Sequence, residues 1–304
     1  PGTAEMTHID ERSLFVGILL SVALLTTCFI STNEAPRFSL ALALGNDGEL
    51  AIDKYLTGII HPAYNAIDYS EHNDRRFSDK GPLQSFLAAP VVRLVMWTGV
   101  YFETAVYLTT LLFSGLPLAL TSILILRFGH KVHRPGDVAP ETVVLAYAFC
   151  TPAFYYATMF YSSSLTSLLA FASFYLVFTT RDEHGPGWII IAGALAGATG
   201  LNDYAALPIF PCLLAFCLMR VPRRVLPFLT SGLIVLSLLP LYQYALFGDP
   251  FMPTYGSHGV FTDVHSQGAY MGIGIIKPEA VFGLALGPSR GLFTISPLLI
   301  VAVV

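Results

Sequence analysis

Charged residues are scarce in this chain, because only 12% of its 304 residues are Asp, Glu, Lys or Arg. Soluble domains carry about 25%. Together with a hydrophobic content of 54% and a mean hydropathy of +0.64, this scarcity argues against a soluble domain and indicates a protein of the lipid bilayer. The net charge of −4 argues against a nucleic-acid partner and against a polybasic lipid-binding face.

Cysteine is also rare, and all four cysteines lie inside apolar runs: Cys28, Cys150, Cys212 and Cys217. This placement favours buried single thiols over a disulfide or a metal site. The cysteines therefore give no information about the redox compartment.

A convincing signal peptide is lacking as well, because the first apolar run is long enough to span a bilayer and no small-residue cleavage site follows it. The sequence opens without Met and stops inside an apolar run at Val304. We therefore expect a fragment of a longer protein, truncated at its C-terminal side.

Long apolar runs predict an all-α polytopic membrane protein with about eight transmembrane helices in one domain, residues 1–304. A bilayer core needs about 20 apolar residues per helix, and a spanning helix satisfies its own backbone polar groups. The last run is cut off, and the fifth and sixth are short enough to be two tilted helices or one broken element. The runs are Ser13 to Thr32, Ala105 to Leu126, Glu141 to Phe160, Ser164 to Thr180, Trp188 to Leu201, Ala205 to Met219, Val225 to Phe247, and one opening near Gly291.

Basic residues gather in alternate short loops, which predicts the orientation of the chain. Basic short loops are cytoplasmic, so we expect a multi-pass protein of the plasma or inner membrane with a cytoplasmic N-terminus. Two long polar loops, about 33–103 and about 248–290, then face outward and contain interfacial helices such as Arg37 to Gly45 and Leu83 to Phe102. The basic residues are Arg127, Lys131, Arg134, Arg181, Arg220, Arg223 and Arg224.

The first candidate site is "TNEAPRFSLAL", immediately after the first predicted span. Glu34 lies there at the membrane boundary between Asn33 and Arg37. A partly desolvated carboxylate near a cation suits a general base or a metal ligand. The alternative is a plain helix end, with Pro36 in the first turn of the next helix.

The second candidate is the charge run in "NDRRFSDKGP". Lys80 precedes the rigid Gly81-Pro82 turn and a helix start, so its ammonium and the free N–H groups of the helix suit a phosphate. Asp79 would hold Lys80 or bind a metal, and Asp53 of the same loop is a further supporting acid. The alternative is a solvated charge run.

The third candidate lies in the second long loop. Arg290 stands at the outer mouth of the last run, either as a topology anchor or as an anion contact. His258 and His265 flank Asp263, which leaves open a divalent metal ion or an ordinary surface role.

The order of these motifs resembles the GT-C superfamily of membrane glycosyltransferases, which use polyprenyl-phosphate sugars. The likeness to bacterial relatives of protein O-mannosyltransferases and of aminoarabinose transferase runs from about Thr32 to the chain end. The motifs that carry it are "NEAPR", "FSDKGP", "FGDP" and "SRGLFTISPLL".

The resemblance implies a GT-C-like helical bundle and an inverting transfer from a polyprenyl-phosphate-linked sugar to an acceptor that the sequence does not identify. It assigns Glu34 to catalysis, Lys80, Arg290 and Arg37 to the donor phosphate, and Asp79 to the support of Lys80. A divalent metal stays open as a cofactor. Asn33 departs from the pattern, because the mannosyltransferases have a second carboxylate there, and "YSSSLTS" lacks an acid found in some relatives.

Two other functions remain open from the sequence. A catalytically inactive GT-C-like subunit of a membrane complex is compatible with the Asn33 departure. A transporter predicts ionisable residues at mid-membrane depth, and none stands well inside the predicted spans.

Overall fold

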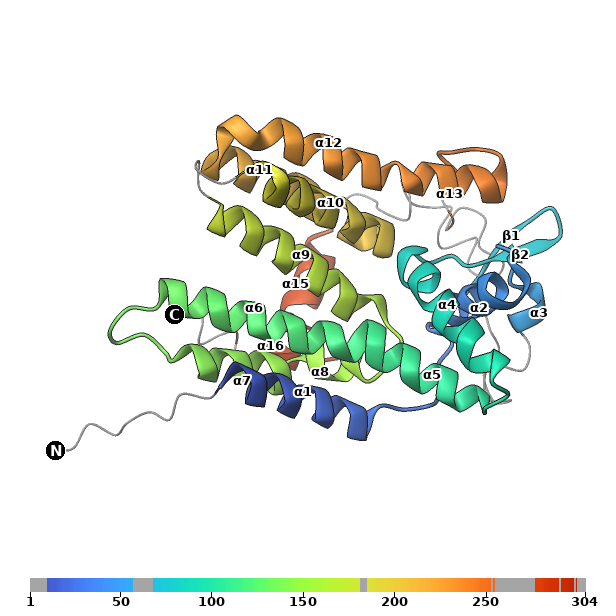
Figure 1. The fold of residues 1–304 in the computed structure, drawn as a ribbon, viewed down its shortest axis with the longest axis horizontal. Coiled ribbons are helices and arrows are strands. Elements are labelled where there is room, and N and C mark those ends of the chain that lie inside the picture. The colour runs from blue at the N-terminus through green and yellow to red at the C-terminus, as the bar shows by residue number, and fades with distance from the viewer. Residues whose placement is uncertain are drawn as a thin grey trace.

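The computed structural model describes residues 10–56, 68–180, 185–252, 254, 277–289, 291–297 and 299. These residues form a bundle of helices with one small hairpin (Figure 1), so the prediction of a predominantly helical protein is confirmed. The main elements are α1 (Glu11–Leu25), α2 (Ala35–Leu42), η1 (Ala43–Asp47), α3 (Asp53–Leu56), β1 (Ser70–His72), β2 (Arg75–Phe77), α4 (Leu83–Trp97), α5 (Phe102–Thr110), η2 (Leu111–Gly115), α6 (Leu116–Val132), α7 (Pro140–Cys150), α8 (Pro152–Ala157), α9 (Ser162–Thr179), α10 (Gly187–Asn202), η3 (Tyr204–Ala206), α11 (Ile209–Arg220), η4 (Pro222–Arg224), α12 (Val225–Leu236), α13 (Leu238–Phe247), α15 (Pro278–Leu286) and α16 (Leu292–Ile295).

Three helices in the described part of the chain are long and apolar enough to cross a membrane: Phe102–Val132, Ser162–Thr179 and Pro222–Phe247. They indicate membrane association. Shorter apolar helices occupy the positions of other predicted spans, so the count of eight remains a prediction.

Two of the predicted spans are interrupted in the structure. The helix expected over 141–160 breaks between α7 and α8, where Thr151 is extended and Pro152 follows. Proline lacks the N–H that a continuing helix needs. The first predicted span, Ser13 to Thr32, is helical only as far as Leu25.

Glycines allow α10 and α12 to pack closely. A Cβ on Gly197 would lie 2.2 Å from the carbonyl oxygen of Gly232, and one on Gly193 would lie 2.1 Å from that of Phe228. These backbones therefore touch at a separation that no larger residue permits. Small residues at helix crossings are the usual means of tight packing between apolar helices.

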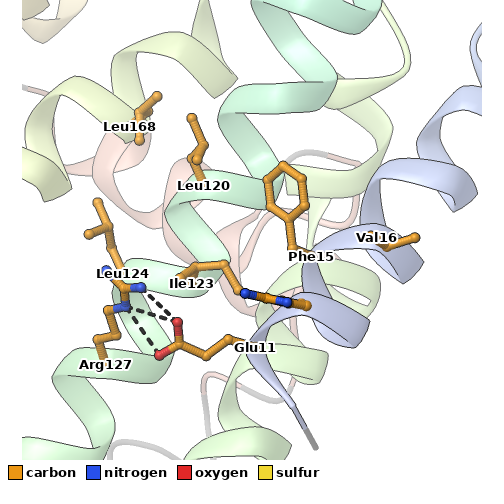
Figure 2. A pocket seen from close by; sticks show the side chains of 9 residues that line it. Glu11, Phe15, Val16, Leu120, Ile123, Leu124, Arg127 and Leu168 are labelled. Atoms are coloured by element: carbon orange, nitrogen blue, oxygen red, sulfur yellow. Dashed lines mark hydrogen bonds and ion pairs between the residues drawn. The ribbon is translucent and has the colours of Figure 1, made fainter.

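The bundle has two chemically different ends. α6 and α11 end, and η4 and α12 begin, at what we call the basic end, which carries Arg127, Lys131, Arg220, Arg223 and Arg224 (Figure 1). At this end Arg127 and Glu11 join α6 to α1 through hydrogen bonds of 2.7–3.1 Å (Figure 2). The short turns after α8 and α10 lie at the opposite end, as does the hairpin. This arrangement agrees with the predicted grouping of the basic loops.

The first long polar loop is more compact than the sequence indicated. Every residue of α2 is buried, so the prediction of an interfacial helix at Arg37 to Gly45 is wrong. α2 packs against α4 instead, through a core that includes Phe38 and Val92. α4 does expose part of its surface, because Trp97 is 83% exposed.

The charge run also contains a hairpin that the sequence reading did not predict. β1 and β2 are antiparallel, with Ser70 opposite Phe77. Asn73 and Asp74 form the turn with φ values of 52° and 58°. Positive φ at both central residues fits a type I′ turn, which matches the twist of a hairpin.

We expect Gly197→Ala to destabilise the folded chain, because its new methyl group would meet the backbone of α12. Overpacking of this kind costs about 1–3 kcal/mol. Thermal unfolding in detergent measures the effect. Gly17→Ala in α1 is the matched control, since no atom lies within 4 Å of its added Cβ. An equal loss of stability in both variants would contradict the close α10–α12 contact.

Candidate functional site

Four segments that are distant in sequence meet at the end opposite the basic end. They are the α1–α2 turn, the Ser78–Gly81 stretch before α4, the turn between α8 and α9, and the turn between α10 and η3. Hydrogen bonds and close backbone contacts connect them. We call their polar side chains the loop-end cluster: Glu34, Arg37, Asp79, Lys80, Ser162, Asn202 and Asp203.

Glu34 stands directly before α2 and is only 1% exposed. Its Oε2 accepts the Ser31 N–H at 2.7 Å and its Oε1 accepts the Phe160 N–H at 2.9 Å. Both carboxyl oxygens are therefore used by the backbone, and the second bond ties α2 to the α8–α9 turn. The helix start at Pro36, expected under the alternative reading of this motif, is present too.

Burial raises the pKa of Glu34 above its ordinary value of 4.5. Hydrogen bonds from Ser31 and Phe160 and the charge of Arg37 act in the opposite direction, but burial dominates. A carboxyl group in this state holds its proton to a higher pH than an exposed one.

Arg37 is 5% exposed and makes its side-chain hydrogen bonds to neutral groups. Its Nη1 donates to the carbonyl and the Oδ1 of Asn33, both at 3.2 Å, and its Nη2 donates to Ser162 Oγ at 3.1 Å. The guanidinium carbon lies 5.7 Å from the centre of the Tyr161 ring. Arg37 Nε has no hydrogen-bond partner among the described residues.

Ser162 connects Arg37 to a carboxylate. While its Oγ accepts from Arg37, the same hydroxyl donates to Asp203 Oδ2 at 2.8 Å. The other oxygen of Asp203 accepts the Ala205 N–H at 3.1 Å and so caps η3. Asp203 is partly exposed, in contrast to Glu34. Arg37, Ser162 and Asp203 therefore form a hydrogen-bonded chain, which we call the Arg37 relay. It runs from a buried cation through a hydroxyl to a partly exposed acid.

Asn202 fixes the backbone on which Ser162 stands. Its Nδ2 donates to the Ser162 carbonyl at 3.0 Å and to Thr166 Oγ1 at 2.9 Å. Its Oδ1 is buried and has no hydrogen-bond partner within the described ranges. The start of α9 and the end of α10 are therefore held together directly beside the relay.

Lys80 is 7% exposed, so its ammonium is not part of a solvated charge run. Its Nζ lies 2.7 Å from Asp79 Oδ2 and 3.4 Å from Asp68 Oδ2. Asp79 is fully buried, and its carbonyl accepts a hydrogen bond from Thr254. Asp79 thus pairs with Lys80, and two carboxylates compensate the charge of one ammonium.

Gly81 brings the Lys80 segment against the relay. A Cβ at this position would lie 2.4 Å from the carbonyl oxygen of Asn202, so only glycine fits. The Tyr204 hydroxyl donates to the Lys80 carbonyl at 3.3 Å. Glu34 and Lys80 make no hydrogen bond to each other in the described structure, and the Lys80 segment meets this region through the contacts of Gly81 with Asn202 and of Tyr204 with the Lys80 carbonyl.

The remaining predicted site residues lie in different places. Asn33 is bonded to Arg37. Asp53 accepts the Arg76 N–H at 3.0 and 3.2 Å, so it supports the hairpin and not Lys80. Arg75 pairs with Glu49, and Arg76 stacks on Tyr69, so the charge run divides and only Asp79 and Lys80 turn inward. Arg290 and the His258, Asp263 and His265 group lie outside the described residues.

No group of three or more His, Cys, Asp or Glu side chains that could hold a metal occurs among the described residues. Asp68 and Asp79 come together, but the Lys80 ammonium lies between them. The divalent metal cofactor that the sequence left open therefore stays a prediction.

The sequence reading missed Asp203, Ser162 and Asp68 as members of the site. Asp203 stands in a short loop between two apolar runs, and Ser162 belongs to the "YSSSLTS" stretch, which was noted only for the acid it lacks. One signal could have identified Asp203. It is an ionisable residue in a short turn between two apolar runs, in a chain that has few charged residues. Nothing local in the sequence identifies Asp68.

No protein-family model, curated protein or solved structure matches this chain.

We predict that Glu34→Gln separates two roles of this side chain. The amide cannot accept hydrogen bonds with both of its terminal atoms, so one buried backbone N–H loses its partner, at a cost of about 1–3 kcal/mol. Because the folded pKa of Glu34 is raised, its contribution to stability is full below the pKa of the unfolded chain and falls as pH rises through the folded pKa.

The stability advantage of the parent over Glu34→Gln is therefore largest at acidic pH and shrinks toward neutral pH. Thermal unfolding of both proteins in detergent between pH 4 and pH 8 measures this difference. The contributions of the other titrating groups are the same in both proteins and cancel when the two are compared. An advantage that grows with pH would show that the folded protein favours the ionised carboxylate.

Proposed function

We propose that the chain is a membrane glycosyltransferase of the GT-C type, which transfers a sugar with inversion from a polyprenyl-phosphate donor to an acceptor hydroxyl on the extracytoplasmic face of the membrane. The observation that carries the proposal is the relay from Arg37 through Ser162 to Asp203. It brings a cation and a partly exposed acid together at one end of an apolar helical bundle.

The relay supports donor binding by Arg37. A polyprenyl phosphate has its tail in the bilayer and its charged head at the surface, so its binding site needs a cation at the end of apolar helices. Arg37 makes its side-chain hydrogen bonds only to neutral groups within the described residues, and its planar guanidinium suits a phosphate. Lys80 is less suited, since Asp79 and Asp68 already compensate its charge.

The geometry supports Asp203 better than Glu34 as the base that receives the acceptor proton. A general base has to reach the proton it removes. Both residues have their two carboxyl oxygens engaged, Glu34 by backbone N–H groups and Asp203 by the Ser162 hydroxyl and the Ala205 N–H, so exposure is the difference between them, and Glu34 is buried. Asp203 is partly exposed. In this proposal Glu34 positions the α1–α2 turn, and thereby Arg37, and has no direct part in bond making.

The proposed reaction is a single displacement. The acceptor oxygen forms a bond to the anomeric carbon of the sugar while the bond from that carbon to the phosphate oxygen breaks. The phosphate leaves with the bonding electron pair, and the positive charge of Arg37 stabilises it. The acceptor proton passes to the Asp203 carboxylate. No further oxidant, reductant or co-substrate is needed to balance this step.

The test is sugar transfer by the purified chain reconstituted in lipid vesicles with radiolabelled polyprenyl-phosphate mannose or aminoarabinose, together with a membrane extract as the source of acceptors. The label leaves the lipid donor if transfer occurs. We expect Asp203→Asn to lower the rate by at least about 100-fold, which is the usual size of a general-base effect. Arg37→Gln should raise the donor concentration needed for half-maximal rate.

Asp53→Asn is the matched control, because it makes the same acid-to-amide change at a carboxylate that contacts only the hairpin backbone. It should keep the parent rate. Equal rates for Asp203→Asn and Asp53→Asn would eliminate Asp203 as the base.

An inactive GT-C-like subunit of a membrane complex is the second candidate. It is favoured by the pairing of Lys80 with Asp79 and Asp68 and by the use of both Glu34 oxygens within the fold. These contacts are complete without a substrate. A folded parent that releases no sugar from either donor would contradict the enzyme and favour the subunit.

A further inference from the structure

A cavity lies at the basic end, where its lining residues stand at the ends of three helices. It measures about 280 Å³ and is lined by Lys131, Phe178, Thr179 and Arg220. These residues come from the C-terminal turns of α6, α9 and α11, three helices that are separate in sequence. The fold therefore brings two basic side chains, from different helices, to the lining of one small cavity.

The two cations of this pocket are not compensated within the described ranges. Lys131 and Arg220 are exposed, and neither makes a hydrogen bond or an ion pair with another described residue, whereas two described acids of the same end are engaged. Glu11 pairs with Arg127, and Glu141 lies 3.6 Å from His130. The guanidinium carbon of Arg220 lies 5.7 Å from the centre of the Phe178 ring, which forms one wall of the cavity.

The helix dipole explains part of this arrangement, because cations are favoured in the last turn of any helix. It accounts for each cation separately. It does not account for their convergence on one cavity from different helices. An anion bound between them would account for it.

The position of the pocket indicates which anion it takes. Two helices that are long and apolar enough to cross a membrane, Phe102–Val132 and Ser162–Thr179, end at this cavity. Where these helices cross a bilayer, the cavity at their ends would lie near the level at which the bilayer meets water. Basic pockets between the ends of membrane helices suit the phosphate of a lipid headgroup.

We propose that the pocket of Lys131 and Arg220 binds the headgroup phosphate of an anionic phospholipid. The ammonium and the guanidinium contact the phosphate oxygens, and the ring of Phe178 lies against the glycerol and the first methylene groups. The site is separate from the loop-end cluster, and it does not depend on the transferase proposal.

Lipid binding by the purified full chain tests this site. The probes are phosphatidylglycerol, phosphatidylcholine and inorganic phosphate, each titrated into the protein in detergent, with bound lipid counted by native mass spectrometry. We expect phosphatidylglycerol to bind in preference to phosphatidylcholine. The double variant Lys131→Gln/Arg220→Gln should weaken phosphatidylglycerol binding by about 30-fold, from the usual contribution of two basic residues near a membrane surface.

The matched control is Arg134→Gln/Arg223→Gln, which removes the same charge from the same end without touching the pocket lining. It should bind phosphatidylglycerol within about threefold of the parent, because screening weakens the contribution of exposed charges outside a specific contact. Circular dichroism and gel filtration confirm that each variant is folded.

Three results would overturn the proposal: an equal loss of binding in the two double variants, equal binding of phosphatidylglycerol and phosphatidylcholine by the parent, or displacement of phosphatidylglycerol by equimolar inorganic phosphate. The first indicates only a diffuse basic surface. The second indicates an acyl-chain site without headgroup recognition, and the third indicates a site for soluble anions.

Discussion

The architecture of the loop-end cluster depends on the burial of Arg37. A guanidinium loses the hydration that stabilises its charge when it enters an apolar bundle, so the fold must supply hydrogen-bond acceptors around it. Asn33 and Ser162 supply them, and Ser162 transmits the contact to Asp203. This requirement brings the turn before α2, the start of α9 and the end of α10 to one place. Removal of any member leaves a buried polar group without its partner, which is the costly outcome.

The bundle uses its scarce charges at its two ends. At the loop end, carboxylates and cations are interleaved, so that Lys80 lies between Asp79 and Asp68 while Arg37 reaches Asp203 through a hydroxyl. At the basic end, two cations converge on a cavity without an acid in its lining. Between the ends the helices rely on packing, with Gly193 and Gly197 drawing α10 against α12. The proposed transferase site and the proposed lipid site therefore lie at opposite ends of the bundle.

The sequence predicts the helical class well, because the apolar runs are long and the basic residues fall in alternate loops. It predicts that Glu34 stands directly before a helix, and it singles out Asp79 and Lys80, but their burial appears only in the structure. It fails where tertiary contacts override local pattern: α2 reads as amphipathic, but all of its residues are buried, with Arg37 bonded to Ser162 and Ser39 to the Tyr55 carbonyl. Asp203 and Asp68 were missed because their importance arises from partners far away in the chain, which no local motif encodes.

The most direct test of the account is an experimental structure of the full chain in a lipid bilayer with a short-chain polyprenyl phosphate. The account predicts density for the phosphate within hydrogen-bond distance of the Arg37 guanidinium, with its isoprenoid tail running between the helices toward the bilayer. The account would be contradicted if, at a saturating concentration of the lipid, the phosphate bound elsewhere and the Arg37 relay kept its hydrogen bonds without contacting it.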